Sequence, residues 1–183
     1  MNYFNIDKNL NFVLSEDKKY SKDDLIKNVK EEFIKSGINV LDTVKLSHAL
    51  VKMVLNFDEK TISVIMYLKN ITGAGWKDKP KFKRVQVANL KFDSPEFLIS
   101  SNNTINLIMG YYNFDENPIL VCWDAYRYLE HNTVRSCYVT VDSLKRGYIK
   151  KYYEGVDSGQ KLWIFEGLYS KQFFSDYLLY LNR

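Results

Sequence analysis

Residues 51–68 read VKMVLNFDEKTISVIMYL, and this stretch decides the fold class. Val51, Met53 and Leu55 alternate with polar or smaller residues, which is the period-two pattern of a strand with one buried face. The polar DEK triplet in the middle predicts a turn, and the eight residues after it are rich in β-formers. The stretch therefore predicts a β-hairpin.

Five further segments have strand character: residues 83–90, 104–112, 119–123, 135–141 and 161–165. Residues 119–123 (ILVCW) are wholly apolar, which is typical of a central strand buried on both faces. Strands and helices do not alternate regularly, so a parallel, doubly wound sheet is not expected. The pattern predicts a mainly β, α+β fold: a seven-stranded antiparallel pseudobarrel, or open barrel, with flanking helices.

Helical patterns lie near the two ends of the chain. Ser21 is placed to cap a helix, and Gly37 stands where that helix would end. Apolar residues recur at helical spacing between them: Leu25, Ile26, Val29, Phe33 and Ile34. A short helix capped by Asp142 or Ser143 and a closing helix from Ser170 are also expected.

The length and composition favour one domain. The chain has 183 residues, of which 46% are hydrophobic, enough for one substantial core. We expect residues 1–45 to form an N-terminal arm plus a helix, and residues 46–183 to form the barrel core and the closing helix. Cys122 and Cys137 lie in apolar runs, and the first residues of the sequence show no signal-peptide pattern. These features predict reduced thiols in a cytoplasmic protein. No apolar run is long enough for a membrane span.

The positive charge is concentrated in one segment. Residues 69–91 carry a net charge of +6, whereas the whole chain carries only +4. This window surrounds a glycine-containing loop, residues 72–76 (TGAGW), and a second basic segment (residues 123–151, net +3) follows an acidic one (residues 92–122, net −4). Two basic segments on a near-neutral chain indicate a polyanionic partner, and double-stranded DNA is the simplest.

Two groups of residues are candidates for contact with DNA. The first group is Trp76, Lys77, Lys79, Lys81, Lys83, Arg84 and Gln86, and the second is Tyr126, Arg127, His131, Asn132 and Arg135. Lysines neutralise phosphates, whereas arginine pairs with guanine and asparagine with adenine in the major groove. The alternative interpretation of the first group is a solvated hairpin tip, with the tryptophan packed on the body and the glutamine at a sheet edge.

Motifs for catalysis and for cofactors are missing from the sequence. The two histidines, His48 and His131, are not in a metal-binding pattern, and no CxxC, GxSxG or phosphate-loop motif occurs. A magnesium-dependent nuclease needs an acidic residue followed by a D/E-x-K tripeptide on a strand, and no such tripeptide falls in a predicted strand. We therefore expect a binding domain without a catalytic site, metal or cofactor.

Several motifs together resemble a known family. They are residues 67–76 (YLKNITGAGW), 80–87 (PKFKRVQV), 108–112 (IMGYY), 120–128 (LVCWDAYRY) and 163–166 (WIFE). They resemble the sequence-recognition domains of bacterial restriction systems, which are similar to the B-three (B3-like) pseudobarrel of plant transcription factors. The resemblance covers roughly residues 50–183.

The resemblance implies both a fold and a function. Members of this family grip the major groove of duplex DNA with two loops, which would correspond here to Gly73–Arg84 and Tyr126–Arg135. Cleavage in such phage-defence systems belongs to another domain or subunit, so the resemblance implies a nuclease or NTPase domain or subunit of the same system as a partner. The chain would then be a sequence-specific, or modification-sensitive, DNA-binding domain associated with a restriction endonuclease.

Two alternatives come from other functional classes. One is a metal-dependent restriction endonuclease with a non-standard site built from Asp58, Asp115, Glu116 and Asp124. The other is a reader of RNA or of a modified base, in which Trp76, Tyr111 and Tyr126 form an aromatic cage.

Overall fold

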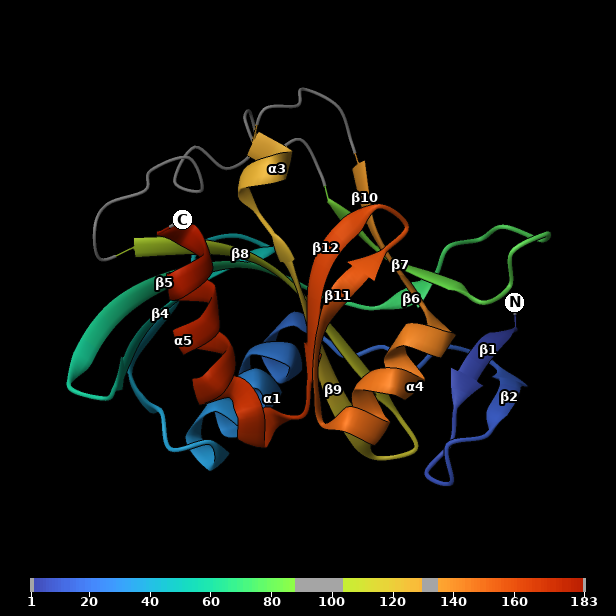
Figure 1. Cartoon of the computed structure of the whole chain (residues 1–183), viewed down its shortest axis with the longest axis horizontal. Helices are drawn as coiled ribbons and strands as arrows, with labels where there is room; N and C mark the ends of the chain where they lie inside the picture. Colours follow the sequence, from blue (N-terminus) through green and yellow to red (C-terminus); the bar gives the residue numbers. More distant parts are fainter. Residues whose placement is uncertain (1, 88–103, 130–134, 183) are drawn as a thin grey trace.

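A computed structural model describes residues 2–87, 104–129 and 135–182 (Figure 1). Its helices are α1 (Lys22–Lys35), α3 (Tyr126–Leu129), α4 (Val141–Lys150) and α5 (Ser170–Leu181), with a short 3-10 turn at Gly167–Tyr169. Its strands are β1 (Tyr3–Ile6), β2 (Phe12–Ser15), β3 (Asn39–Lys45), β4 (Leu50–Phe57), β5 (Lys60–Asn70), β6 (Thr72–Gly73), β7 (Phe82–Val87), β8 (Thr104–Phe114), β9 (Asn117–Asp124), β10 (Arg135–Thr140), β11 (Tyr152–Asp157) and β12 (Gln160–Phe165). The described fold is therefore α+β and mostly β, as expected.

The predicted hairpin is confirmed as β4 and β5, which pair antiparallel from Leu50 opposite Tyr67 to Phe57 opposite Lys60. Asp58 and Glu59 form its turn with positive φ angles of 48° and 61°, as a type I′ turn requires. The hairpin belongs to a seven-stranded main sheet with the order β11-β12-β9-β8-β5-β4-β3.

The prediction of a purely antiparallel pseudobarrel is wrong. The main sheet is open, and β5 pairs parallel to β8, from Ser63 opposite Thr104 to Asn70 opposite Tyr111. After β5 the chain leaves the main sheet to form β6 and β7, so it returns as β8 in the same direction. Two strands that the sequence assigned to the barrel, β7 and β10, instead pair with each other in a separate small sheet of order β10-β7-β6.

The main sheet is the middle layer of three. On β9, the predicted central strand, Ile119, Val121 and Trp123 pack into the cluster shared with α4 and the small sheet. The intervening Leu120 and Cys122 pack into the cluster shared with α1 and α5. One face of the sheet is thus covered by α1 and α5, and the other by the small sheet and α4 (Figure 1).

The small sheet lies close against the main sheet at Gly110 of β8. A Cβ atom at this position would stand 2.5 Å from Cγ1 of Ile71 and 3.0 Å from Cγ2 of Val85. Both cysteines are buried and free, and Trp123 and Trp163 are also buried. Residues 88–90, which the sequence added to the end of β7, lie outside the described residues.

The helix ends agree with the sequence at α1 and differ slightly at α4. The hydroxyl of Ser21 accepts the amide N–H of Asp24, and Gly37 follows the helix with φ of 87°. At α4 the cap is Thr140, two residues before the earlier of the two predicted caps. The first residues of the chain, expected to form an N-terminal arm, form the β1–β2 hairpin. No helix in the described ranges is both long and apolar enough to cross a bilayer.

Candidate nucleic-acid interface

The small sheet presents one face to solvent, and we call it the outer face. Across its antiparallel strands, Arg84 of β7 lies opposite both Tyr138 and Thr72, and Gln86 lies opposite Ser136. Side chains alternate along a strand, so Phe82 shares this side. The outer face is therefore made of Thr72, Phe82, Arg84, Gln86, Ser136 and Tyr138, none of which is buried.

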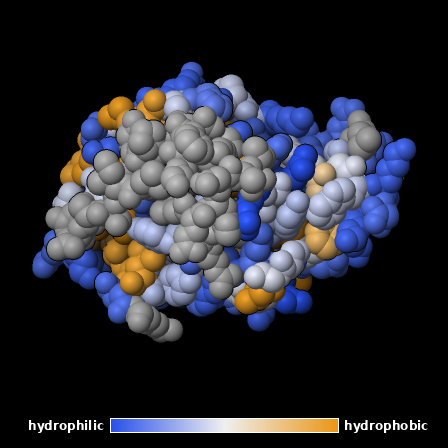
Figure 2. All heavy atoms as spheres, turned by 90° about the horizontal axis from the view of Figure 1, so that it is seen from above, coloured by the Kyte–Doolittle hydropathy of each residue, from blue (hydrophilic) through white to orange (hydrophobic). Residues whose placement is uncertain are grey.

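Residues 74–81 connect β6 to β7, and we call them the basic loop. This loop stands at one end of the outer face and projects from the body (Figure 1). Trp76 anchors it: its ring stacks on Tyr138 with the centroids 5.0 Å apart and lies 5.7 Å from the ring of Phe82. The Trp76 side chain is still 37% exposed. In the view from above, hydrophilic residues dominate the end of the molecule where this loop lies (Figure 2).

The three lysines of the loop differ in their exposure and in their contacts with other residues. Lys77 and Lys79 are exposed, and the ammonium of Lys79 lies 5.3 Å from the centre of the Trp76 ring. Lys81 is half-buried and forms an ion pair of 3.2 Å with Asp142 at the start of α4. The loop tip therefore offers Lys77 and Lys79 most freely.

Lys83 lies where the sequence analysis did not expect it. Its side chain is fully buried and forms an ion pair of 2.5 Å with Asp17, whose other carboxylate oxygen accepts the amide N–H of Gly73. Burial lowers the pKa of Lys83, and the neighbouring carboxylate opposes that shift. In this conformation the ammonium of Lys83 is not exposed for the expected contact with phosphate, because it lies against Asp17 inside the protein.

In the second basic segment, Arg135 lies at the other end of the small sheet. Arg135 begins β10 and is exposed, but it lies opposite the buried Val87 and so alternates away from the outer face. Tyr126 begins α3, where its N–H donates to Asp124 and burial raises the pKa of its phenol. The side chain of Arg127, and all of His131 and Asn132, lie outside the described residues.

The described end of the second predicted arm, Arg135, and the basic loop therefore lie at opposite ends of β7. The basic loop enters β7 at Phe82, whereas Arg135 stands beside the far end of β7 at Val87. The strand β7 has six residues, so its two ends lie about 17 Å apart. This separation is greater than the width of the major groove, about 12 Å. Arg84 and Gln86 lie between these two ends.

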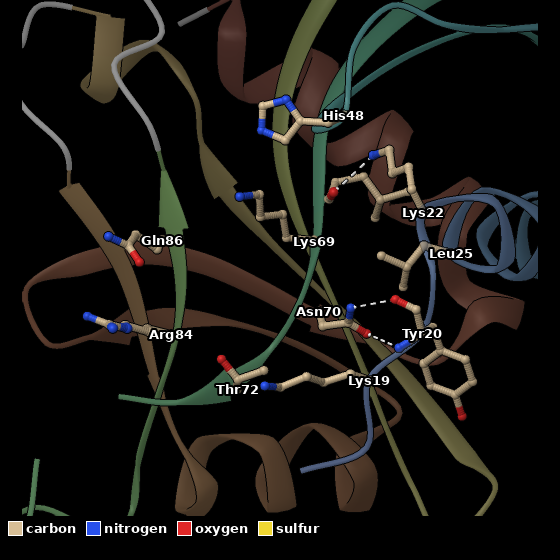
Figure 3. Close-up of a pocket in the computed structure, with 11 residues that line it drawn as sticks. Lys19, Tyr20, Lys22, Leu25, His48, Lys69, Asn70, Thr72, Arg84 and Gln86 are labelled. Atoms are coloured by element: carbon tan, nitrogen blue, oxygen red, sulfur yellow. Dashed lines mark hydrogen bonds between the residues drawn. The ribbon is translucent and has the colours of Figure 1, made fainter. Parts of the chain in front are cut away.

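A basic pocket of about 370 Å³ adjoins the outer face, and sequence analysis did not predict it. Four cationic side chains line it, from Lys19, Lys22, Lys69 and Arg84, together with His48 and Gln86; no described carboxylate does. In Figure 3, Lys19 and Lys69 extend toward the strands that carry Thr72, Arg84 and Gln86. Lys69 was part of the basic window, but nothing in the neutral segment of residues 1–68 marked the other lysines as its neighbours.

Lys22 is the least ordinary of these cations. Its ammonium donates to the carbonyls of Ala49 and Leu68, at 2.9 and 3.0 Å. Burial, and then repulsion from Lys45 and Lys69, lowers the pKa of Lys22 from 10.5 to about 8. The fold thus holds a partly desolvated ammonium beside other positive charges.

This lowered pKa makes a prediction for stability. Between about pH 8 and pH 10.5 the unfolded chain binds more protons at Lys22 than the folded chain does, so stability rises with pH in that window. We expect the free energy of unfolding of the wild type, relative to that of Lys22→Met, to increase from pH 8 to pH 10.5. Urea unfolding at several pH values measures it, with Lys27→Met on the same helix as the control. Parallel profiles for the wild type and Lys22→Met would contradict the assignment.

The alternative sites do not assemble. Asp58 lies in the β4–β5 turn and Asp115 in the β8–β9 turn, at opposite ends of the parallel pair β5 and β8. Asp124 lies opposite Leu107, far from the β8–β9 turn, and accepts the hydroxyl of Tyr180. No group of three metal-ligating side chains occurs among the described residues.

The proposed aromatic cage is not formed either. Tyr111 is buried in the cluster shared with α1 and α5, where Tyr20 contacts it edge-on at 5.5 Å. Trp76 lies over the small sheet, which covers the opposite face of the main sheet. These two rings therefore cannot share a ligand in this conformation.

Comparison with known proteins identifies the family. No curated protein and no solved structure matches the chain, so the B3-like assignment has no support from a similar structure. A family model described as methylase-associated X1 matches residues 62–178, from β5 to α5, which is more than half of the chain. An association with methylases agrees with the restriction-modification context that the sequence motifs implied. The chain belongs to the methylase-associated X1 family.

Proposed function

We propose that this chain is a duplex-DNA-binding domain of a restriction-modification system, and that it recognises a specific, modified or unmodified sequence. The observation that carries the proposal is the outer face itself. It holds an arginine and a glutamine between two basic segments, and a pocket of further cations adjoins it. Each of these groups matches a chemical feature of duplex DNA.

The two kinds of side chain would divide the work. Lys77 and Lys79 are exposed point charges at a loop tip, so they suit phosphates and would contribute affinity for every sequence. Arg84 and Gln86 project from a strand, and their planar groups suit the base edges of the major groove. Cleavage or methylation would belong to another domain or subunit of the same system.

The salt dependence of binding tests the phosphate contacts. We expect the logarithm of the association constant for duplex DNA to fall linearly with the logarithm of salt concentration, and Lys77→Gln/Lys79→Gln to lower that slope by about 2. Fluorescence anisotropy between low and physiological salt measures it.

The control removes the same charge from another part of the molecule. Lys60→Gln/Lys171→Gln changes two lysines beside the β4–β5 turn, where Lys171 pairs with Asp58. We expect this variant to keep the wild-type slope. If the wild type and both double variants have equal salt slopes, Lys77 and Lys79 do not contact phosphate and the loop is not part of the interface.

A further inference from the structure

We propose that the basic pocket is a phosphate-binding site in its own right, filled by one phosphate group of a nucleotide. This site is separate from the loop tip, and it is formed mainly by residues of α1, the segment before it and β5. Duplex DNA is the phosphate source that the proposed function supplies, and to that extent the inference rests on it. A free nucleotide would supply the same chemistry.

The first argument is the missing counter-charge. Ion pairs among the described residues engage lysines elsewhere on the surface, for example Lys45 with Asp23 and Lys81 with Asp142. No ion pair between residues in the described ranges involves Lys19, Lys22 or Lys69. Cations that gather in a concave site without a carboxylate repel one another, and a bound anion removes that repulsion.

The second argument is that Lys22 is held in place before any ligand arrives. It is the first residue of α1, directly after the Ser21 cap, and two of its three N–H groups are used by the carbonyls of Ala49 and Leu68. Within the described part of the chain, this leaves one N–H for a ligand. The positive end of the α1 dipole adds to the same potential.

The third argument is the rigidity of the wall that carries Lys19. The side chain of Asn70 on β5 accepts the N–H of Tyr20 and donates to its carbonyl, both at 3.0 Å (Figure 3). Two residues before Lys19, Asp17 is fixed by Lys83 and by the amide of Gly73. The segment is therefore tied at both ends, and little ordering would be lost when an anion binds.

The size and lining restrict the ligand. A volume of about 370 Å³ falls at the lower end of the range for small-molecule sites, about 300–1,000 Å³. Leu25 and Leu68 contribute apolar surface beside the cations, whereas the amide of Asn70 is already used. Several ammonium groups that line one cavity suit the oxygens of a phosphate.

The test is a titration of the full chain followed by amide chemical shifts in heteronuclear NMR. The probes are inorganic phosphate, adenosine 5′-monophosphate and, as the control without phosphate, adenosine. We expect the first two to shift the amides of Lys19–Leu25 and Leu68–Thr72, and adenosine not to do so. Absence of phosphate-dependent shifts in these amides would overturn the proposal.

Variants of the pocket lysines test whether the amide chemical-shift changes arise from phosphate bound in the pocket. Lys22→Met/Lys69→Met should weaken phosphate binding at least about tenfold, and Lys77→Gln/Lys79→Gln should leave it unchanged. Because Lys22 also bonds two carbonyls, Lys69→Gln serves as a second, milder variant that should weaken binding in the same direction. Shifts that persist at full affinity in both pocket variants would contradict the site.

Duplex binding by the same variants distinguishes the two sources of phosphate. If DNA fills the pocket, Lys22→Met/Lys69→Met weakens duplex binding and lowers its salt slope. If a free nucleotide fills it, the variant loses nucleotide binding but keeps its affinity for the duplex. Failure of the proposed function looks different, since the wild type would then bind phosphate in the pocket but no duplex.

Discussion

Replacing Lys83 with methionine is expected to destabilise the fold by about 3–5 kcal/mol, because the change leaves the carboxylate of Asp17 buried without its partner. The ion pair joins the segment before α1 to the small sheet, and the same carboxylate also accepts the N–H of Gly73. Urea unfolding of the wild type and the variant measures the loss of stability. We expect the two proteins to have the same slope of unfolding free energy against urea concentration.

A second substitution distinguishes this structural role from a contact with DNA. Lys83→Met/Asp17→Asn removes both charges but keeps an oxygen that can accept the N–H of Gly73, so it should recover about 1–3 kcal/mol of the lost stability. The folded fraction of both variants should keep the wild-type salt slope of duplex binding, because neither change removes an exposed charge from the interface. A stable Lys83→Met variant with a lower salt slope would contradict the buried ion pair.

Replacing Arg84 with alanine is expected to cost about 1–3 kcal/mol, or roughly 5–150-fold, in affinity for the preferred DNA site. The reason is its place on the outer face, between Tyr138 and Thr72 and at the edge of the basic pocket. Affinity for unrelated duplexes should fall by less, so the ratio of specific to nonspecific binding should decrease. Competition binding with two duplexes measures that ratio.

The matched control for Arg84 is another arginine with a known partner. Arg146 on α4 donates to the hydroxyl of Tyr153 at 3.0 Å and does not belong to the outer face. Arg146→Ala should keep the wild-type ratio of specific to nonspecific binding. If Arg84→Ala weakens all sequences equally, the arginine contacts phosphate and does not read bases.

The parts of the fold that sequence predicted correctly depend on local signals. The alternation in residues 51–57 and the polar triplet after it gave the β4–β5 hairpin. The Ser21 cap and the following helical spacing gave α1, and the wholly apolar run of residues 119–123 gave the doubly buried β9. In each case a few adjacent residues carry the whole signal.

The pairing of distant strands was not predictable in the same way. Nothing within residues 60–70 or 104–114 indicates that these strands run parallel, because their direction depends on the path of the chain between them. The small sheet depends on the pairing of β7 with β10, almost fifty residues later in the sequence. The expected barrel therefore contained strands that the structure has, but it lacked β1, β2, β3, β6 and β11 and had the wrong pairing of β5, β7, β8 and β10.

The candidate site was predicted in part for similar reasons. The cluster of lysines identified the loop, but the burial of Lys83 could have been found from its alternation with Val85 and Val87 on the same strand. No comparable signal existed for Lys19, Lys22 and His48. They lie in a segment without net charge, and only folding brings them beside Lys69 and Arg84.

The most direct test of the central claim is selection of random-sequence duplex DNA by the full chain, at about physiological salt, with and without cytosine methylation, followed by sequencing. We predict an enriched motif in one or both libraries, and loss of that enrichment in Arg84→Ala. If the wild type retains no duplex at all, the chain is not a DNA-binding domain and the basic loop has another partner.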